Sequence, residues 1–487
     1  MIKFLRIYRE GIFINTPYRM DEGAITQLIC DAAPSAVWMF TMIRKKIRNF
    51  SRMRMIALGF LIIILIGTLL LMTPAASRSR EATGFLSALF TAVSSSCVTG
   101  LVVTDTYLHW SLFGQIIILI LIQLGGLGFI TVGFGFSFLL QRRISLTQRG
   151  LLKESVNVTD DSGLVKLAKL ILKGTALIEG AGAVILSACF IPEMGLLWGI
   201  YYGIFHSVSA FCNAGFDLMS RFGYSSFTGY NDNPVVVITL VLLILTGGLG
   251  FFVWADLKEH KFHFRKYALH TKLVLSTSLI LVAGGTIAFF FIERNNVFAD
   301  MGTGQAVLNA LFCAVTPRTA GFNMVDNGAL SDAGKLLTIF LMFIGGCPGS
   351  TAGGIKVTTI AVIVLYLKST FTRTDGVNVF KRRLEDDAVS KATAVFATNF
   401  FIAAIAILIL ACTNSLSLTD LTFEAVSAIS TVGMTTGITT SLNTCGKLII
   451  ALLMYLGRVG SLSFALSFTD KKKLSHIRLP KEHINIG

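Results

Sequence analysis

Four short segments of this 487-residue sequence resemble one another, and each ends in a glycine. Each begins with a phenylalanine, has a valine three residues later and then a serine or threonine, and reaches its glycine nine or ten residues after the phenylalanine. Successive glycines lie 115, 106 and 112 residues apart, and this near-constant spacing indicates four internal repeats. The segments are 90–100, 205–215, 312–321 and 423–433.

The chemistry open to such segments is coordination of a cation by backbone carbonyl groups. Each segment is shorter than the roughly 20 residues that a spanning helix needs, so we expect a re-entrant helix followed by extended backbone. Non-helical backbone at membrane depth is tolerated only where it is buried in protein or lines a water-filled cavity, which places the four segments around one axis. Their carbonyl oxygens could replace the hydration shell of the cation. Glycine suits the narrowest point because it has no side chain and adopts unusual dihedral angles.

Long apolar stretches on both sides of each segment must position it. The chain is 53% hydrophobic and 14% charged, with a mean hydropathy of +0.71, whereas soluble domains carry about 25% charge. We therefore predict an all-α membrane protein of four helix–re-entrant loop–helix repeats, with eight transmembrane helices around a central pore. The expected spans are 55–74 and 112–140, 165–190 and 234–254, 273–292 and 335–367, and 392–412 and 447–468.

The domain organisation follows from these repeats. The four repeats are expected at 55–145, 146–258, 259–372 and 373–470. They lie between a cytoplasmic N-terminal tail, 1–54, and a cytoplasmic C-terminal tail, 471–487. The N-terminal tail is either an interfacial helix or partly ordered.

The net charge of +15 is unevenly distributed along the chain. Lysine and arginine cluster in alternate connections, and this pattern predicts a multi-pass protein of the cytoplasmic membrane with both termini in the cytoplasm. The excess charge thus reflects topology, and we expect no nucleic-acid partner. The basic clusters are 44–54, 142–153, 258–266, 381–383 and 471–473.

The four segments, above all Cys97-Val-Thr-Gly-Leu-Val-Val-Thr-Asp105, resemble the filter loops of the Trk/Ktr/HKT potassium transporter superfamily. KtrB-type bacterial membrane subunits fit best, and the resemblance covers about residues 55–470. It implies one filter glycine per loop, and an all-glycine set is associated with preference for potassium. Gly437 is a rival for the fourth place, but the spacing from Phe423 favours Gly433. The expected potassium-binding filter comprises Val98, Thr99, Gly100, Asn213, Ala214, Gly215, Thr319, Ala320, Gly321, Thr431, Val432 and Gly433.

The third repeat contains a glycine-rich stretch, 345–354, inside its second span. Proline and closely spaced glycines interrupt a helix, so we expect an unwound loop below the filter. The alternative is a kinked helix that packs through small residues. The resemblance implies that an intramembrane loop of this kind acts as a gate. The expected gate residues are Gly345, Gly346, Pro348, Gly349, Ser350, Thr351, Gly353, Gly354 and Lys356, together with Arg458.

Arg458 lies inside the last predicted span, where a charge is costly and usually functional. The resemblance implies an arginine that faces the pore beneath the filter. We expect Arg458 to pair with carbonyl groups of the 345–354 loop in the closed pore; the alternative is an arginine that extends to the membrane surface. On the other side of the filter, Asp105, Asp217 and Asp326 either concentrate cations or are ordinary loop acids.

The expected function is potassium uptake across the cytoplasmic membrane, gated from within the membrane and regulated by a cytosolic partner. The alternatives are a sodium-coupled or sodium-conducting cation transporter, or the membrane subunit of a cation-pumping assembly. Metalloprotease and serine-hydrolase motifs are absent, so we expect no enzyme. We expect no cofactor in this chain, potassium as the substrate and sodium as the alternative coupling ion. The resemblance implies a homodimer in membrane lipid that binds a cytosolic RCK-type nucleotide-binding ring.

Overall fold

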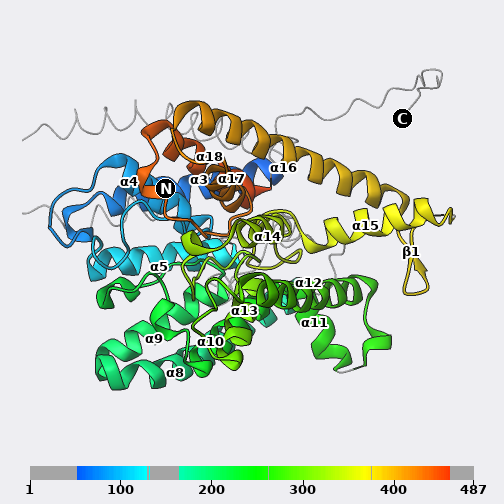
Figure 1. The fold of residues 1–487 in the computed structure, drawn as a ribbon, viewed down its shortest axis with the longest axis horizontal. Helices are drawn as coiled ribbons and strands as arrows, with labels where there is room; N and C mark the ends of the chain where they lie inside the picture. Colours follow the sequence, from blue (N-terminus) through cyan, green and yellow to red (C-terminus); the bar gives the residue numbers. More distant parts are fainter. Residues whose placement is uncertain (1–51, 129–130, 132–163, 262, 375, 461–487) are drawn as a thin grey trace, which may run out of the picture. The chain divides into compact units, whose positions relative to one another are not determined.

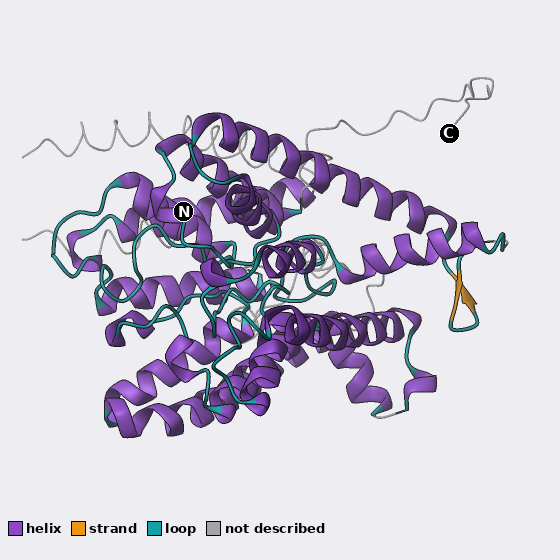
Figure 2. Ribbon diagram, viewed as in Figure 1, coloured by secondary structure: helices purple, strands orange, loops and turns teal. Residues whose placement is uncertain are grey.

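The computed structural model describes residues 52–128, 131, 164–261, 263–374 and 376–460. The predictions for the N-terminal tail up to residue 51, for the basic cluster 142–153 and for the C-terminal tail 471–487 lie outside these residues. Helices make up most of the described chain (Figure 2). The strands found there form one antiparallel hairpin of β1 (Asn378–Val379) and β2 (Arg382–Arg383). The prediction of a helical protein is therefore confirmed.

In the part of the chain that the structure describes, four helices are long and apolar enough to cross a membrane, within residues 54–71, 166–194, 269–293 and 387–413. They are rich in Leu, Ile, Val, Phe and Ala, and many of these apolar side chains are exposed on their outward faces. The number of eight spans stays a prediction, because only one further span is found in the described residues, and only if a bent helix pair is counted as one. The four long helices are α3 (Arg52–Leu71), α8 (Leu164–Met194), α12 (Leu269–Glu293) and α16 (Asp386–Thr413).

Each long helix is followed by a short one that contains the first part of a repeated segment. The C-terminal parts of these short helices are almost entirely buried, so each points its last turn into the protein. Non-helical backbone follows each of them and carries the repeated glycine. The short helices are α4 (Phe85–Ser96), α9 (Leu196–Phe211), α13 (Thr303–Val315) and α17 (Leu418–Ile429).

A further helix follows each short helix and begins at a capping side chain. Ser111, Asn233, Ser331 and Asn443 each accept a hydrogen bond from a backbone N–H in the first turn, which satisfies one of the free donors at a helix start. The 3-10 turns found between the described helices are η1 (Pro74–Ala76), η2 (Met219–Phe222), η3 (Thr228–Tyr230), η4 (Phe264–Lys266), η5 (Asn327–Ala329) and η6 (Thr439–Ser441). The capped helices are α5 (Leu112–Leu127), α10 (Pro234–Gly248), α14 (Asp332–Phe343) and α18 (Thr444–Val459).

These capped helices stop earlier than predicted. Gly250 has a φ of 91°, and here the chain turns by 96° between α10 and α11 (Phe251–His260), so the prediction of one continuous span at 234–254 is wrong. The helices α5 and α18 end beside Gly128 and Gly460, which also have positive φ. After α14 the chain is non-helical until α15 (Val357–Phe371). The break that was predicted for the second helix of the third repeat thus has a counterpart in the second repeat.

The capped helices close the arrangement into a ring. Each of them contacts the next short helix along the chain: α5 contacts α9, α10 contacts α13, and α14 contacts α17. The last one, α18, contacts the first short helix, α4. Figure 1 shows α17 and α18 from the end of the described chain beside α3 and α4 from its beginning. The four glycine-bearing stretches are thereby brought around one centre.

Candidate functional site

The four repeated glycines meet in a closed ring. A β-carbon built on Gly100 would lie 2.5 Å from the carbonyl oxygen of Ala214 and 3.0 Å from the α-carbon of Gly215. A β-carbon on Gly215 would lie 3.0 Å from the α-carbon of Gly321, and one on Gly321 would lie 3.3 Å from that of Gly433. A β-carbon on Gly433 would meet the α-carbon of Gly100 at 2.9 Å, which completes the ring. Each glycine therefore leaves space that a side chain would take from its neighbour.

The backbone of the four loops has an unusual and shared conformation. All four ring glycines have positive φ, between 69° and 100°. The residue two positions earlier also has positive φ in every loop, although it is never a glycine. Such angles are costly for residues with a side chain and persist where the surrounding structure fixes them. These residues are Val98 (56°), Asn213 (59°), Thr319 (71°) and Thr431 (52°).

The N–H groups of the loops point back toward the short helices. Thr99, Ala214 and Val432 each donate to a carbonyl five residues earlier, at 2.8 Å. Ala320 donates to Thr316, four residues earlier, at 2.9 Å, because the third segment is one residue shorter. In a planar trans peptide the preceding carbonyl points the opposite way. The carbonyl groups of residues 98, 213, 319 and 431 are thus directed away from the short helices.

The hydroxyl group of the repeated serine or threonine forms a hydrogen bond with the backbone of each glycine loop. In the first and fourth loops, Gly100 and Gly433 donate to the hydroxyl oxygens of Ser94 and Ser427, both at 3.1 Å. In the second and third loops the hydroxyl is the donor. Ser209 donates to the carbonyl of Phe216 at 2.7 Å, and Thr316 donates to that of Phe322 at 2.6 Å. This explains why the four segments share a hydroxyl residue at this position.

A cavity of about 460 Å³, which we call the vestibule, opens on one side of the ring. All four ring glycines line it, together with Asp105 and Asp217. Asp105 is held by the backbone N–H groups of Tyr107 and Leu108, at 2.8 and 2.7 Å. Burial raises the pKa of the half-buried Asp217 to about 6, and the nearby Asp105 adds to this rise. The third predicted acid, Asp326, instead caps η5 and does not line the vestibule.

The non-helical stretch 344–356 between α14 and α15, which we call the gate loop, lies on the other side of the ring. The Thr351 hydroxyl is 3.2 Å from the carbonyl oxygen of Phe211 and 3.3 Å from Oδ1 of Asn213. A β-carbon on Gly353 would overlap Oγ1 of Thr431. The loop therefore touches the residues of the ring that lie farthest from the vestibule.

Backbone hydrogen bonds fasten the gate loop to the ends of other helices. They join it to α10, to the start of α11 and to α18, so that helices from the second and fourth repeats hold this loop of the third repeat. Residues 345–354 all belong to this non-helical stretch, and Lys356 directly precedes α15. The bonds run from Cys347 N to Gly248 O (3.1 Å), Thr351 N to Gly247 O (3.3 Å), Phe251 N to Gly349 O (2.8 Å) and Gly354 N to Gly457 O (3.4 Å).

Among the described residues, two cationic side chains donate to carbonyl groups of the gate loop. The Arg458 guanidinium, in the last turn of α18, donates to the carbonyl of Thr351 and to those of Gly125 and Gly126 at the end of α5. These carbonyls carry the negative end of the α5 dipole, which stabilises the charge. Lys356 donates to the carbonyls of Ala352 and Gly353 within the loop, at 2.8 and 3.0 Å. The structure thus brings Arg458 together with the loop predicted for it.

Several functional candidates gave no recognisable signal in the sequence. The first residue after each repeated phenylalanine faces the protein interior, and two of these residues anchor the chain that follows the ring. His206 accepts a hydrogen bond from the N–H of Leu218 at 3.1 Å, while its other ring nitrogen lies 2.8 Å from the carbonyl of Tyr202. Glu424 accepts from the hydroxyl of Thr439. These residues occupy the same position within the repeat, but they differ in residue type, so the sequence pattern does not reveal a shared role.

Arg318, in the third loop, is a buried cation that sequence analysis also missed. Its guanidinium lies 2.9 Å from the hydroxyl of Ser278 on α12 and 4.0 Å from the sulfur of Cys347 in the gate loop. Asn213 of the second loop donates to the Arg318 carbonyl at 3.3 Å. Arg318 therefore links the third glycine loop to the gate loop and to α12.

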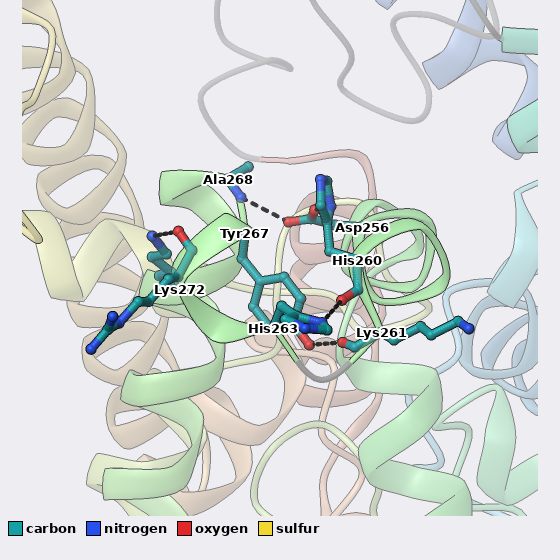
Figure 3. A network of polar contacts seen from close by, with 8 residues as sticks. Asp256, His260, Lys261, His263, Tyr267, Ala268 and Lys272 are labelled. Atoms are coloured by element: carbon teal, nitrogen blue, oxygen red, sulfur yellow. Dashed lines mark hydrogen bonds and ion pairs between the residues drawn. The ribbon is translucent and has the colours of Figure 1, made fainter.

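Glu179 on α8 accepts from the Gln123 amide, which lies 3.2 Å from both carboxylate oxygens. This contact joins α8 to α5. A separate network fixes the turn between α11 and α12 (Figure 3), where part of the basic cluster 258–266 lies. There Asp256 lies 2.8 Å from His260 and accepts from the N–H of Ala268 at 2.9 Å. The first network extends to Cys212 of the second repeated segment, whose sulfur lies 3.5 Å from Gln123 Oε1 and 3.8 Å from Glu179 Oε1, whereas the contacts of the second network stay within the turn.

The chain is similar to several known proteins. A model of the TrkH family, described as a cation transport protein, matches residues 25–477. The potassium/sodium uptake protein NtpJ of Enterococcus hirae is 40% identical over 455 residues, 92% of this chain and 100% of that protein. The Ktr system potassium uptake protein B of Bacillus subtilis is 37% identical over 441 residues, 90% of this chain and 97% of that one. The crystal structure of the potassium transporter TrkH from Vibrio parahaemolyticus matches with a TM-score of 0.65 at 19% identity, covering 84% of each chain, which shows a common fold.

Proposed function

Because the chain belongs to the TrkH family of cation transport proteins, we propose that it takes up potassium across the cell membrane through the ring of four glycine loops. Two relatives carry potassium uptake in their names, and neither is named as an enzyme. The proposal extends the family assignment to named residues. In it, the loops form the selectivity filter of a pore surrounded by eight transmembrane helices in four repeats.

The observation that carries the proposal is the ring itself. A cation that sheds its water needs oxygen ligands held at a fixed distance. In all four loops the N–H groups are bound to the short helices, so the carbonyl groups at positions 98, 213, 319 and 431 are left to face the centre. The vestibule supplies hydrated ions on one side, and Asp105 and Asp217 attract cations into it.

Ring glycines set the width of this passage. A side chain at any of the four positions would collide with the next loop, which would displace the carbonyl groups from their common centre. We propose that the all-glycine ring favours potassium, the larger and more easily dehydrated ion. Sodium transport, alone or coupled to potassium, is the second candidate, and the name of the 40% identical relative, a potassium/sodium uptake protein, supports it.

We propose that the gate loop and Arg458 close the pathway below the ring. The loop lies against Asn213 and Thr431, and the Arg458 guanidinium places a positive charge beside it. A cation leaving the ring would meet both a steric obstacle and a like charge. Opening then requires the loop to leave the ring and Arg458 to release the Thr351 carbonyl.

The wider assembly in this proposal is a homodimer in membrane lipid, with both termini in the cytoplasm and a cytosolic RCK-type nucleotide-binding ring as regulator. Family membership and the basic connections support it. Light scattering of the purified protein tests the dimer. Co-purification with and without a candidate ring protein tests the partner.

The test of the function is ion flux into liposomes that contain the purified protein. Potassium flux well above that of empty liposomes and above sodium flux is expected for the wild type. In Gly100→Ser, the new side chain would push against Ala214, so potassium flux or its preference over sodium should be lost. Equal potassium preference in both proteins would contradict the proposal.

A further inference from the structure

A second cavity, of about 650 Å³, lies apart from the vestibule and shares no lining residue with it. It is formed by the connection after α3, the start of α5 and the start of α9. Two arginines and two serine hydroxyls line it, whereas no acidic residue does; Glu81, next to Arg80 in the chain, is not part of the lining. The lining consists of Pro74, Ala75, Ser77, Arg78, Arg80, Ser111, Leu112, Gln115 and Trp198.

The wall of this arginine pocket is held rigidly. The backbone around Ser77 pairs with that around Trp110, since Arg78 N donates to His109 O at 2.9 Å and Ser111 N donates to Ala76 O at 2.8 Å. The Ser111 hydroxyl adds a bond of 2.6 Å to the Ala75 carbonyl. These bonds fix the position of the segment that carries both arginines.

Arg78 is oriented before any ligand arrives. Its Nε donates to the Trp110 carbonyl at 3.3 Å, and its guanidinium carbon lies 3.9 Å from the centre of the Tyr107 ring. Within the described ranges, its two terminal nitrogens have no hydrogen-bond partner, and the same is true of the Arg80 side chain. A guanidinium held in this way presents two parallel donors, the geometry that matches phosphate oxygens.

The surroundings of the pocket are those of a membrane surface. The pocket begins three residues after Leu71, the last residue of a helix long enough to span. Below it, Leu112, Ile116 and Ile120 form an exposed apolar stripe on one face of α5, with exposed fractions of 49%, 42% and 53%. Trp198 at the pocket edge is the amphipathic residue typical of the boundary between lipid and water.

We propose that this pocket binds an anionic phospholipid. The phosphate lies between Arg78 and Arg80, and an acyl chain follows the stripe of Leu112, Ile116 and Ile120. Two positive charges without a lining acid select an anion, and the adjoining apolar stripe selects a lipid over a free phosphate ion. The site is separate from the ring, so it does not depend on the proposed pathway of the transported ion.

The test is lipid binding measured by native mass spectrometry on the purified full chain, with phosphatidylglycerol and phosphatidylcholine compared. The wild type should retain phosphatidylglycerol preferentially. The double variant R78Q/R80Q should lose about tenfold or more of this affinity, because the charge-assisted contacts are removed. R78K/R80K, which keeps the charge, should retain part of it. Ile116→Asn should weaken lipid binding through the apolar stripe alone.

The matched control is K368Q/R373Q, which removes two exposed positive charges at the end of α15, far along the chain from the pocket. Its lipid binding should stay within about twofold of the wild type. Equal losses in both double variants, or no preference for phosphatidylglycerol, would overturn the proposal. Displacement of the lipid by millimolar inorganic phosphate would also overturn it, because the pocket would then bind a free anion. A change in oligomeric state in R78Q/R80Q would overturn it as well, because the pocket would then be a contact with a second copy of the chain.

Discussion

The guanidinium of Arg458 donates a hydrogen bond to the backbone carbonyl of Thr351, a residue 107 positions earlier in the chain. The same side chain also bonds to the end of α5 through Gly125 and Gly126. Thr351 in turn contacts Phe211 and Asn213 of the second glycine loop. The Arg458 side chain thus links the ends of α18 and α5 to the gate loop, which itself contacts the end of α9. These contacts lie on the side of the ring opposite the vestibule.

Replacing Arg458 by Gln or Ala should raise potassium flux. Each charge-assisted hydrogen bond lost is worth roughly 1.5–3 kcal/mol, which shifts an equilibrium between closed and open gate loop by about tenfold or more. Flux into liposomes measures the effect. Arg458→Lys keeps the charge without the planar fork, so its flux should lie between those of the wild type and Arg458→Gln. Wild-type flux in Arg458→Ala would remove the gating role.

Substitution of a ring glycine should reduce potassium flux far more than substitution of Gly437, a glycine outside the ring that also has positive φ. Gly321 has a φ of 80°, and a β-carbon there would lie 2.5 Å from the Val432 carbonyl, so Gly321→Ala should abolish most potassium flux. Gly437 has a φ of 98° but no atom within 4 Å of its β-carbon position. Gly437→Ala therefore costs only the strain of a left-handed residue, about 1–2 kcal/mol, and should keep flux and selectivity. Similar losses in the two variants would show that backbone strain alone, not the ring, is responsible.

Glu424 should position the fourth loop through its acceptor oxygen. It is fully buried, and Thr439 donates to its Oε1. Glu424→Gln keeps this acceptor, so the preference for potassium over sodium should change little. Glu424→Ala removes the carboxylate acceptor of the buried Thr439 hydroxyl, which keeps only the Thr435 hydroxyl at 3.0 Å, and should lower both the thermal stability and the potassium preference. A loss of stability with unchanged ion preference would limit Glu424 to a structural role.

Potassium uptake should fall as the pH on the vestibule side is lowered through the pKa of Asp217. Burial and the neighbouring Asp105 raise this pKa to about 6, so the carboxylate is charged at pH 7.5 and mostly neutral at pH 5. Its protonation weakens the attraction of cations into the vestibule. Flux at low potassium concentration, measured across this pH range, should drop in the wild type. In Asp217→Asn the flux should be lower at pH 7.5 and the drop should be smaller; a drop of unchanged size would assign it to another group.

The sequence was sufficient to find the four glycines that the structure brings together. Their signal is local and repeated, so Gly100, Gly215, Gly321 and Gly433 could be aligned without knowledge of any contact. The gate loop was equally visible, because Pro348 and its neighbouring glycines cannot continue a helix.

The early ends of α5, α10 and α18 were missed because hydropathy reports composition and not backbone direction. Gly128, Gly250 and Gly460 stand within apolar stretches, and their composition does not reveal that they have positive φ. A signal was present nonetheless, since Gly125, Gly247, Gly345 and Gly457 recur 24 to 32 residues after the ring glycines. Three of them pack on a short-helix C-terminus, where a β-carbon would meet a carbonyl oxygen of Ser96, Phe211 or Ile429.

Arg318 could not have been predicted by this reasoning. It is the single arginine among the four repeated segments, and its partners Ser278 and Cys347 are 40 and 29 residues away. No periodic pattern connects residues at such distances. Its contacts follow only from the closed arrangement of helices, which depends on packing across the whole described chain.

The most direct test of the account is to locate a bound cation. Crystals grown with rubidium or thallium in place of potassium would give an anomalous signal from the ion itself. We expect a peak at the centre of the ring, within coordination distance of the carbonyl oxygens of Val98, Asn213, Thr319 and Thr431. Anomalous density elsewhere in the protein with none at the ring, under conditions that support flux, would contradict it.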